Sequence, residues 1–176
     1  MLKKLQSLAR ARDGLAAVEF ALLAPIMATF FLGAIELTDA MACNTRVVGL
    51  AATASDLVAQ ETQVSNADIN NIYSALNSIV YPYPTTSIKI VISSVVDDGH
   101  GGAKVAWSDA QNTTARAVNS AVTAPTGVVP AGGSAILAEV TYPYTSPISD
   151  FIVGTMYMTS TFYERPRRSA TVARVP

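Results

Sequence analysis

A stretch of apolar residues near the N-terminus constrains this chain more than any other feature of its sequence. Leu15 to Ile35 has about the 20 predominantly apolar residues that a helix needs to cross the core of a bilayer. Glu19 is the only charged residue in this stretch. An acidic side chain costs roughly 2.5–3.5 kcal/mol at the centre of a bilayer, and less near its boundary. We therefore predict a transmembrane helix over residues 15–36 and a functional partner for the Glu19 carboxylate.

The charges that flank this stretch predict its orientation. Basic residues precede it and acidic residues follow it, namely Lys3, Lys4, Arg10 and Arg12 before, and Glu36 and Asp39 after. By the positive-inside rule the N-terminus stays in the cytoplasm, and residues 37–176 form an outer domain long enough to bury a core. The net charge of -1 gives no electrostatic case for binding nucleic acid.

The periodicity of apolar residues predicts an α+β fold. Spacings of three and four continue to about Gln60, which predicts one long helix, and they recur over Ala67–Ile79, where Asn66 is a candidate N-cap. Beyond the proline-rich residues 81–84 the apolar residues alternate, which predicts strands. We expect these strands at Ser87–Ser93, Lys104–Ser108, Ile136–Tyr142 and Met156–Tyr163. The fold class is then a long N-terminal transmembrane helix that continues into a small antiparallel-sheet outer domain.

Four connecting segments show less regular patterns. The glycine-rich Asp97–Gly102 predicts the tip of a hairpin, and Ala124–Gly133 is a connection rich in proline and glycine. Gln111–Val122 is polar and ambiguous, and a helix is one interpretation of it. Ser146–Val153 is expected to form a loop or a short helix.

No group of residues in the sequence predicts catalysis. His100 is the only histidine, and it stands in a glycine-rich segment beside Asp97 and Asp98. A divalent cation site is one interpretation, but aspartate and glycine are the residues that a turn requires, which favours a solvated hairpin tip. We therefore expect no catalytic residues, no metal ligands, no cofactor and no enzymatic activity.

Three further groups of residues have more than one interpretation. Cys43 is the only cysteine, so it belongs to the core or to a disulfide between chains, and the tendency of cysteine to be buried favours the core. The C-terminal arginines are expected to form a solvated terminus rather than to contact lipid or an acidic partner; they are Arg165, Arg167, Arg168 and Arg174. Two tyrosine pairs are expected to cap the core rather than to form an interface; they are Tyr81 with Tyr83 and Tyr142 with Tyr144.

The segment from Gly14 to Phe20 resembles a type IV prepilin processing site. Its pattern of glycine, four residues, glutamate and an aromatic residue is similar to that of the tight-adherence (Flp) pilus pilins. The resemblance implies that residues 1–14 are a leader, which a prepilin peptidase removes after Gly14 on the cytoplasmic side of the bacterial inner membrane. Leu15 would become the first mature residue, and Glu19 would pair with the free amine of Leu15 in a neighbouring subunit.

Two later segments resemble TadE-like proteins, which are minor pilins or pseudopilins of the same pilus system. They are the strand motifs at residues 138–144 and 159–167. The outer domain makes this chain longer than a typical major pilin, which favours a minor component. The implied partners are the inner membrane, the prepilin peptidase, other pilin subunits and the pilus assembly platform. The alternative is an uncleaved, single-span protein whose outer domain binds a ligand or partner in the cell envelope.

Overall fold

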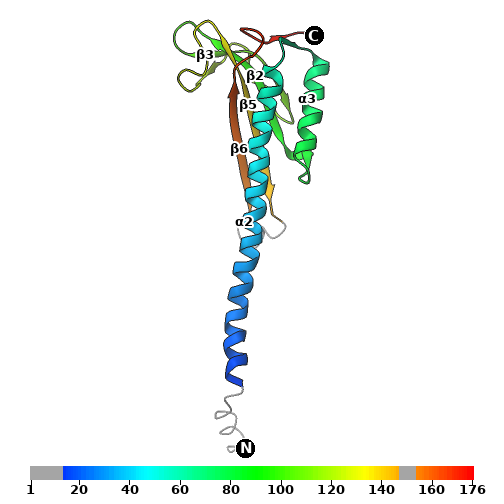
Figure 1. The fold of residues 1–176 in the computed structure, drawn as a ribbon, viewed down its shortest axis with the longest axis vertical. Coiled ribbons are helices and arrows are strands. Elements are labelled where there is room, and N and C mark those ends of the chain that lie inside the picture. Colours follow the sequence, from blue (N-terminus) through cyan, green and yellow to red (C-terminus); the bar gives the residue numbers. More distant parts are fainter. Residues whose placement is uncertain (1–13, 147–153) are drawn as a thin grey trace, which may run out of the picture. The chain divides into compact units, whose positions relative to one another are not determined.

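The computed structural model describes residues 14–146 and 154–176, which divide into two compact units. The first unit ends at Asp39, and the second comprises Ala40–Pro176. Helix α2 (Leu15–Ala59) contributes residues to both units (Figure 1). The second unit also contains β1 (Gln63–Val64), α3 (Asn66–Ile79), the 3₁₀ turn η2 (Thr85–Ser87), β2 (Lys89–Asp97), β3 (Ala103–Gln111), β4 (Ala121–Val122), β5 (Ser134–Thr145), β6 (Thr155–Glu164) and β7 (Ala173–Arg174).

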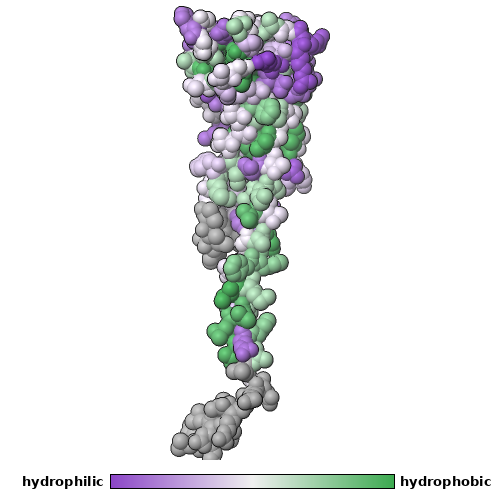
Figure 2. Space-filling model, turned by 60° about the vertical axis from the view of Figure 1, so that its left-hand side comes forward, coloured by the Kyte–Doolittle hydropathy of each residue, from purple (hydrophilic) through white to green (hydrophobic). Residues whose placement is uncertain are grey.

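Helix α2 has two parts with opposite surroundings. Between Val18 and Ile35 its large apolar side chains are exposed, and Figure 2 shows this part of the helix mainly in green. From Ala40 onward one face is buried in the second unit. The buried residues on this face recur at intervals of three or four; they include Cys43, Val47, Leu50, Ala54 and Val58. The prediction of one helix reaching to about Gln60 is confirmed.

Five strands of the second unit form an antiparallel sheet in the order β4-β3-β2-β5-β6. The central pair β2 and β5 is aligned with Ile92 opposite Ala138, and β5 and β6 are aligned with Ala138 opposite Phe162. All four predicted strands are present, and each extends beyond its predicted limits at one end or both. The α+β fold class is therefore confirmed.

The two faces of the sheet are buried by different parts of the chain. One face contributes Ile136 and Ala138 to the main core, which also contains residues of α2, α3 and β2. The opposite face contributes Ala135 and Leu137 to a smaller cluster, which is partly covered by the connection 123–133. This alternation along β5 follows from the two-residue repeat of a strand.

Helix α3 begins one residue earlier than predicted, because its N-cap is Ser65 and not Asn66. Ser65 and Asp68 form a capping box. The Ser65 hydroxyl accepts a hydrogen bond from the Asp68 backbone N–H at 3.3 Å, and the Asp68 carboxylate accepts one from the Ser65 N–H at 2.9 Å. These two bonds satisfy N–H groups that have no partner inside the helix.

The structure can be compared with the predictions for three connecting segments. Residues 112–120 contain turns and bends and no helix, so the helical interpretation of Gln111–Val122 is wrong. Ala124–Gly133 is an irregular connection, as predicted. Within Ser146–Val153 all residues but the first lie outside the described part of the chain. Strands β1 and β7 pair in parallel, with Gln63 opposite Ala173, and no pattern in the sequence predicts this pairing.

Candidate functional site

The exposed apolar surface of the first unit is the main candidate site. Eight large side chains between residues 18 and 31 are more than half exposed; they are Val18, Phe20, Leu22, Leu23, Ile26, Met27, Phe30 and Phe31. A contiguous apolar surface of this kind marks contact with a membrane or another protein. Among the described residues, α2 is the one helix long and apolar enough to cross a membrane. The chain is thus indicated to have a single-pass anchor near its N-terminus.

Two threonine hydroxyls on the same helix form hydrogen bonds within the helix itself. Thr29 donates its hydroxyl hydrogen to the carbonyl of Pro25 at 2.9 Å, and Thr38 donates to the carbonyl of Ala34 at 2.8 Å. An unsatisfied hydroxyl would be costly in hydrocarbon, where every polar group needs a partner within the protein. These bonds therefore suit the helix to a lipid environment.

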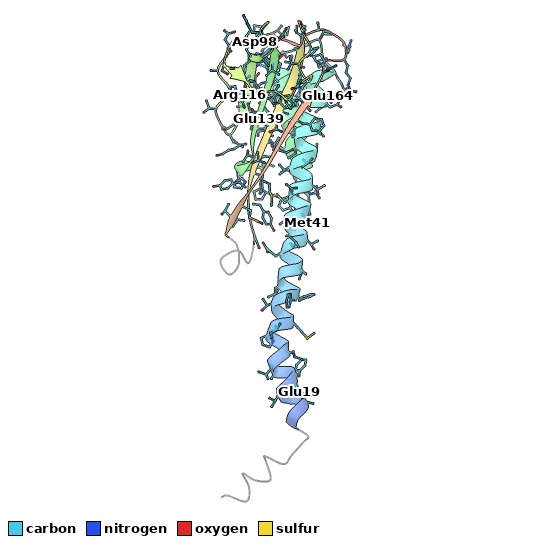
Figure 3. The ribbon with its side chains drawn as sticks, turned by 90° about the vertical axis from the view of Figure 1, so that its left-hand side faces the viewer. Glu19, Met41, Asp98, Arg116, Glu139 and Glu164 are labelled. Carbon is cyan, nitrogen blue, oxygen red and sulfur yellow. The ribbon has the colours of Figure 1, made fainter. Side chains whose placement is uncertain are left out.

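The residues of the predicted processing site lie at the N-terminal end of α2. Gly14 directly precedes the helix, which begins at Leu15. Glu19 and Phe20 are both exposed, and Figure 3 labels Glu19 near the lower end of the helix. Glu19 is the fifth helical residue, and the first turn contains no acidic residue. Because the helix dipole acts mainly within the first turn, it gives Glu19 little stabilisation, and the carboxylate still needs a cationic partner.

The segment with Asp97, Asp98 and His100 is the tip of the β2–β3 hairpin, as the sequence predicts. One Asp98 carboxylate oxygen accepts hydrogen bonds from the backbone N–H groups of His100 at 2.7 Å and Gly102 at 2.9 Å. These bonds lower the pKa of Asp98. Asp97 likewise accepts from the Gly99 N–H at 3.2 Å. Both carboxylates therefore stabilise the turn itself.

Three of the four C-terminal arginines, namely Arg165, Arg167 and Arg174, are bonded to the folded body, so the interpretation as a solvated terminus is wrong for these three, whereas Arg168 is exposed. Arg174 Nε donates to Asp109 Oδ2 at 2.8 Å, and these hydrogen bonds raise the pKa of Arg174. Arg167 forms an ion pair with Asp56 of α2, and its backbone N–H donates to the carbonyl of Ala59 at 2.9 Å. The last bond occupies a carbonyl that the end of α2 leaves open.

Two further contacts make the C-terminal segment part of the core. The Trp107 indole N–H donates to the carbonyl of Val172 at 2.8 Å, and Val172 itself is buried. The Val175 N–H donates to the carbonyl of Val64 at 2.9 Å. The periodicity of the sequence gave no signal for this, because β7 has only two residues and its partner β1 lies more than one hundred residues earlier.

The remaining candidates divide between core and surface. Cys43 is fully buried, which confirms its placement in the core. Tyr142 and Tyr144 are buried, and each packs against Tyr83, with ring centroids 6.0 and 6.2 Å apart. Tyr81 is exposed. The prediction that the tyrosines cap the core is thus right for three of them and wrong for Tyr81.

Comparison with known proteins gives a match for the N-terminal part of the chain. Residues 14–56 match the model of the family described as TadE-like protein. The search of curated proteins and the search of solved structures each gave no match. The resemblance to TadE-like proteins is confirmed over this segment, which includes Gly14 and Glu19. The motifs at residues 138–144 and 159–167 lie beyond the matched segment, and their resemblance stays a prediction.

Proposed function

We propose that this TadE-like chain is a minor pilin or pseudopilin that takes part in the assembly of a tight-adherence (Flp) type IV pilus. The bacterial inner membrane holds it through residues 15–36, with its N-terminus in the cytoplasm and residues 37–176 in the periplasm. The observation that carries the proposal is the exposed apolar surface of α2 between Val18 and Ile35, in which Glu19 is the only charge. The chain acts by packing against other subunits rather than by catalysis.

An exposed helix of this composition is suited to two successive environments. Lipid covers it while the subunit waits in the membrane, and helices of neighbouring subunits cover it in the assembly. In lipid there is little hydrophobic gain from bringing helices together, so close packing and polar contacts decide which helices associate. Glu19 is the residue on this surface that can supply such a polar contact.

The proposed partner of Glu19 is the amine of Leu15 in a neighbouring subunit. Cleavage after Gly14 creates this amine, and the pairing of two charges reduces the cost of holding each of them in lipid. The pairing also sets the axial position of one helix against the next.

Processing is tested by the intact mass and N-terminal sequence of the protein recovered from membranes of a host that makes this pilus. A chain that begins at Leu15 supports prepilin processing. A chain that begins at Met1 would contradict it and favour an uncleaved, membrane-anchored binding protein. Substitution of Gly14 by valine should leave the leader in place and provides the matching reference mass.

The role of Glu19 is tested by Glu19→Ala. We expect unchanged membrane insertion, because the substitution makes the span more apolar, and a strong loss of pilus yield. Glu61→Ala is the control, since it removes an exposed carboxylate just beyond α2. Pilus yield equal to wild type in the Glu19 variant would refute the role of this residue in assembly.

A further inference from the structure

An open groove lies on the face of the sheet opposite the main core. Its volume is about 470 Å³, which is within the range of roughly 300–1,000 Å³ typical of small-molecule sites. It is lined by Lys89, Val91, Thr113, Thr114, Arg116, Glu139, Thr141 and Tyr157. Strands β2 and β5 form its floor, residues 113–116 after β3 lie along one side, and β6 contributes Tyr157 on the other. All of these residues belong to the second unit.

Tyr157 is unusual for its position in the sheet. Tyr157 is 71% exposed. The other residues on the same face of β6 include three threonines, at positions 155, 159 and 161. Its partner across the strand pair is Pro143 of β5. An exposed tyrosine presents a flat apolar ring together with a polar hydroxyl, which suits it to contact ligands that are partly apolar and partly wet.

Arg116 and Glu139 form a fixed pair of hydrogen-bonding groups in the same groove. Arg116 Nε and Nη2 donate to the two Glu139 oxygens at 2.6 and 2.7 Å, and Figure 3 labels the two residues close together. The Arg116 backbone N–H donates to the Ser108 hydroxyl at 3.1 Å. Within residues 14–146 and 154–176, no protein atom accepts a hydrogen bond from Arg116 Nη1, so this nitrogen can donate to a ligand.

We propose that this groove binds a short saccharide. A pyranose ring has one face of C–H groups, which would stack on Tyr157, and a rim of hydroxyls that both donate and accept hydrogen bonds. Arg116 Nη1 would donate to these hydroxyls, and the Glu139 oxygens would accept from them. Because Glu139 balances the charge of Arg116, Lys89 is the only unbalanced cation in the lining, which is too little for a nucleic acid.

The site goes beyond the assembly role proposed above and does not depend on it. Its residues come from β2, β5, β6 and the segment after β3, whereas the assembly role rests on α2. The two proposals can therefore fail separately. Loss of saccharide binding should leave pilus yield in the same host unchanged if the chain contributes the groove to the surface of the assembly.

Saturation-transfer NMR on the full chain tests the proposal directly. The protein is held in a detergent without a sugar headgroup, because a glycoside detergent would compete for the site. The probes are cellobiose, chitobiose, lactose and digalacturonate at millimolar concentration. We expect saturation transfer to at least one of them. A signal with digalacturonate alone would assign Lys89 a role in binding, whereas absence of signal with all four would overturn the proposal.

Matched variants at Tyr157 identify the site. Tyr157→Thr makes this position like its neighbours on β6 and should weaken binding about tenfold, as expected for loss of one aromatic contact. Tyr157→Phe keeps the ring and should bind nearly as well as wild type. Tyr81→Thr removes a tyrosine of similar exposure, 76%, outside the groove, and should have no effect. Equal binding by Tyr157→Thr and wild type would overturn the proposal.

Discussion

Replacement of Arg174 by methionine should destabilise the second unit by about 2–3 kcal/mol, because it breaks the ion pair that holds β7 to the sheet. Arg174 Nε and Nη2 donate to the two Asp109 oxygens at 2.8 and 3.3 Å. Methionine keeps most of the apolar stem of arginine and removes the charge and the donors. The substitution therefore leaves the Asp109 carboxylate without its main partner.

The expected size follows from the partial burial of the pair. The side chains of Arg174 and Asp109 are 21% and 25% exposed, so the pair lies between two known cases. Fully exposed pairs contribute about 0–1 kcal/mol, and breaking a fully buried pair costs about 3–5 kcal/mol. Hydrogen bonds to charged groups contribute about 1.5–3 kcal/mol each, which agrees with a loss in the middle of this interval.

Trp107 provides the assay. It is the only tryptophan of the chain, and its indole N–H is bonded to the backbone of the C-terminal segment at Val172. Urea unfolding of the full chain in detergent, followed by tryptophan fluorescence, reports whether this segment stays bound. Arg168→Met is the control, because it makes the same chemical change at an exposed arginine. A loss for Arg174→Met that is no larger than the loss for Arg168→Met would refute the reasoning.

Three further predictions concern the second unit. Hydrogen bonds from Ser65 lower the pKa of Asp68, so this carboxylate stabilises the fold above about pH 4 and the stabilisation is lost as the pH falls through the lowered pKa. Ser65→Ala should reduce this acid dependence of the melting temperature, and an identical pH profile would contradict it. Leu76→Ala should cost about 2–5 kcal/mol in urea unfolding because Leu76 is fully buried, and a cost below about 1 kcal/mol would show that its site collapses freely. The Cys43 thiol should react with a maleimide only after unfolding, and rapid labelling of the native chain would contradict its burial.

Helix α2, strand β2 and the β2–β3 hairpin tip were predictable because short stretches of sequence determine them. The three- and four-residue spacing along α2 arises from the single face that Val47, Leu50 and Val58 bury. The alternation of Ile90 and Ile92 arises because one face of β2 lies in the core. The hairpin tip was predicted because Asp98 and the glycines around it bond to one another within a few residues. Each of these signals is complete within a short window of sequence.

The features that were missed depend on contacts between distant residues. Arg116 and Glu139 are 23 residues apart, and only the fold brings their side chains together. The parallel pairing of β1 with β7 involves two residues in each strand, too few to produce a periodic pattern. The N-cap of α3 does have a local signal, since Ser65 and Asp68 have the spacing of a capping box.

The two parts of α2 differ in the size of their side chains as well as in their exposure. The buried face within the second unit consists largely of small residues, namely Ala40, Cys43, Ala51, Ala54, Ser55 and Ala59. Small side chains allow dense packing of the helix in a core that the second unit completes by itself. The exposed part instead carries Phe20, Phe30 and Phe31, each able to contribute about 1.5–3 kcal/mol when buried. In the proposed role, lipid or another subunit provides this burial. In the proposed role, the first unit can therefore exchange lipid for protein neighbours while the core of the second unit stays intact.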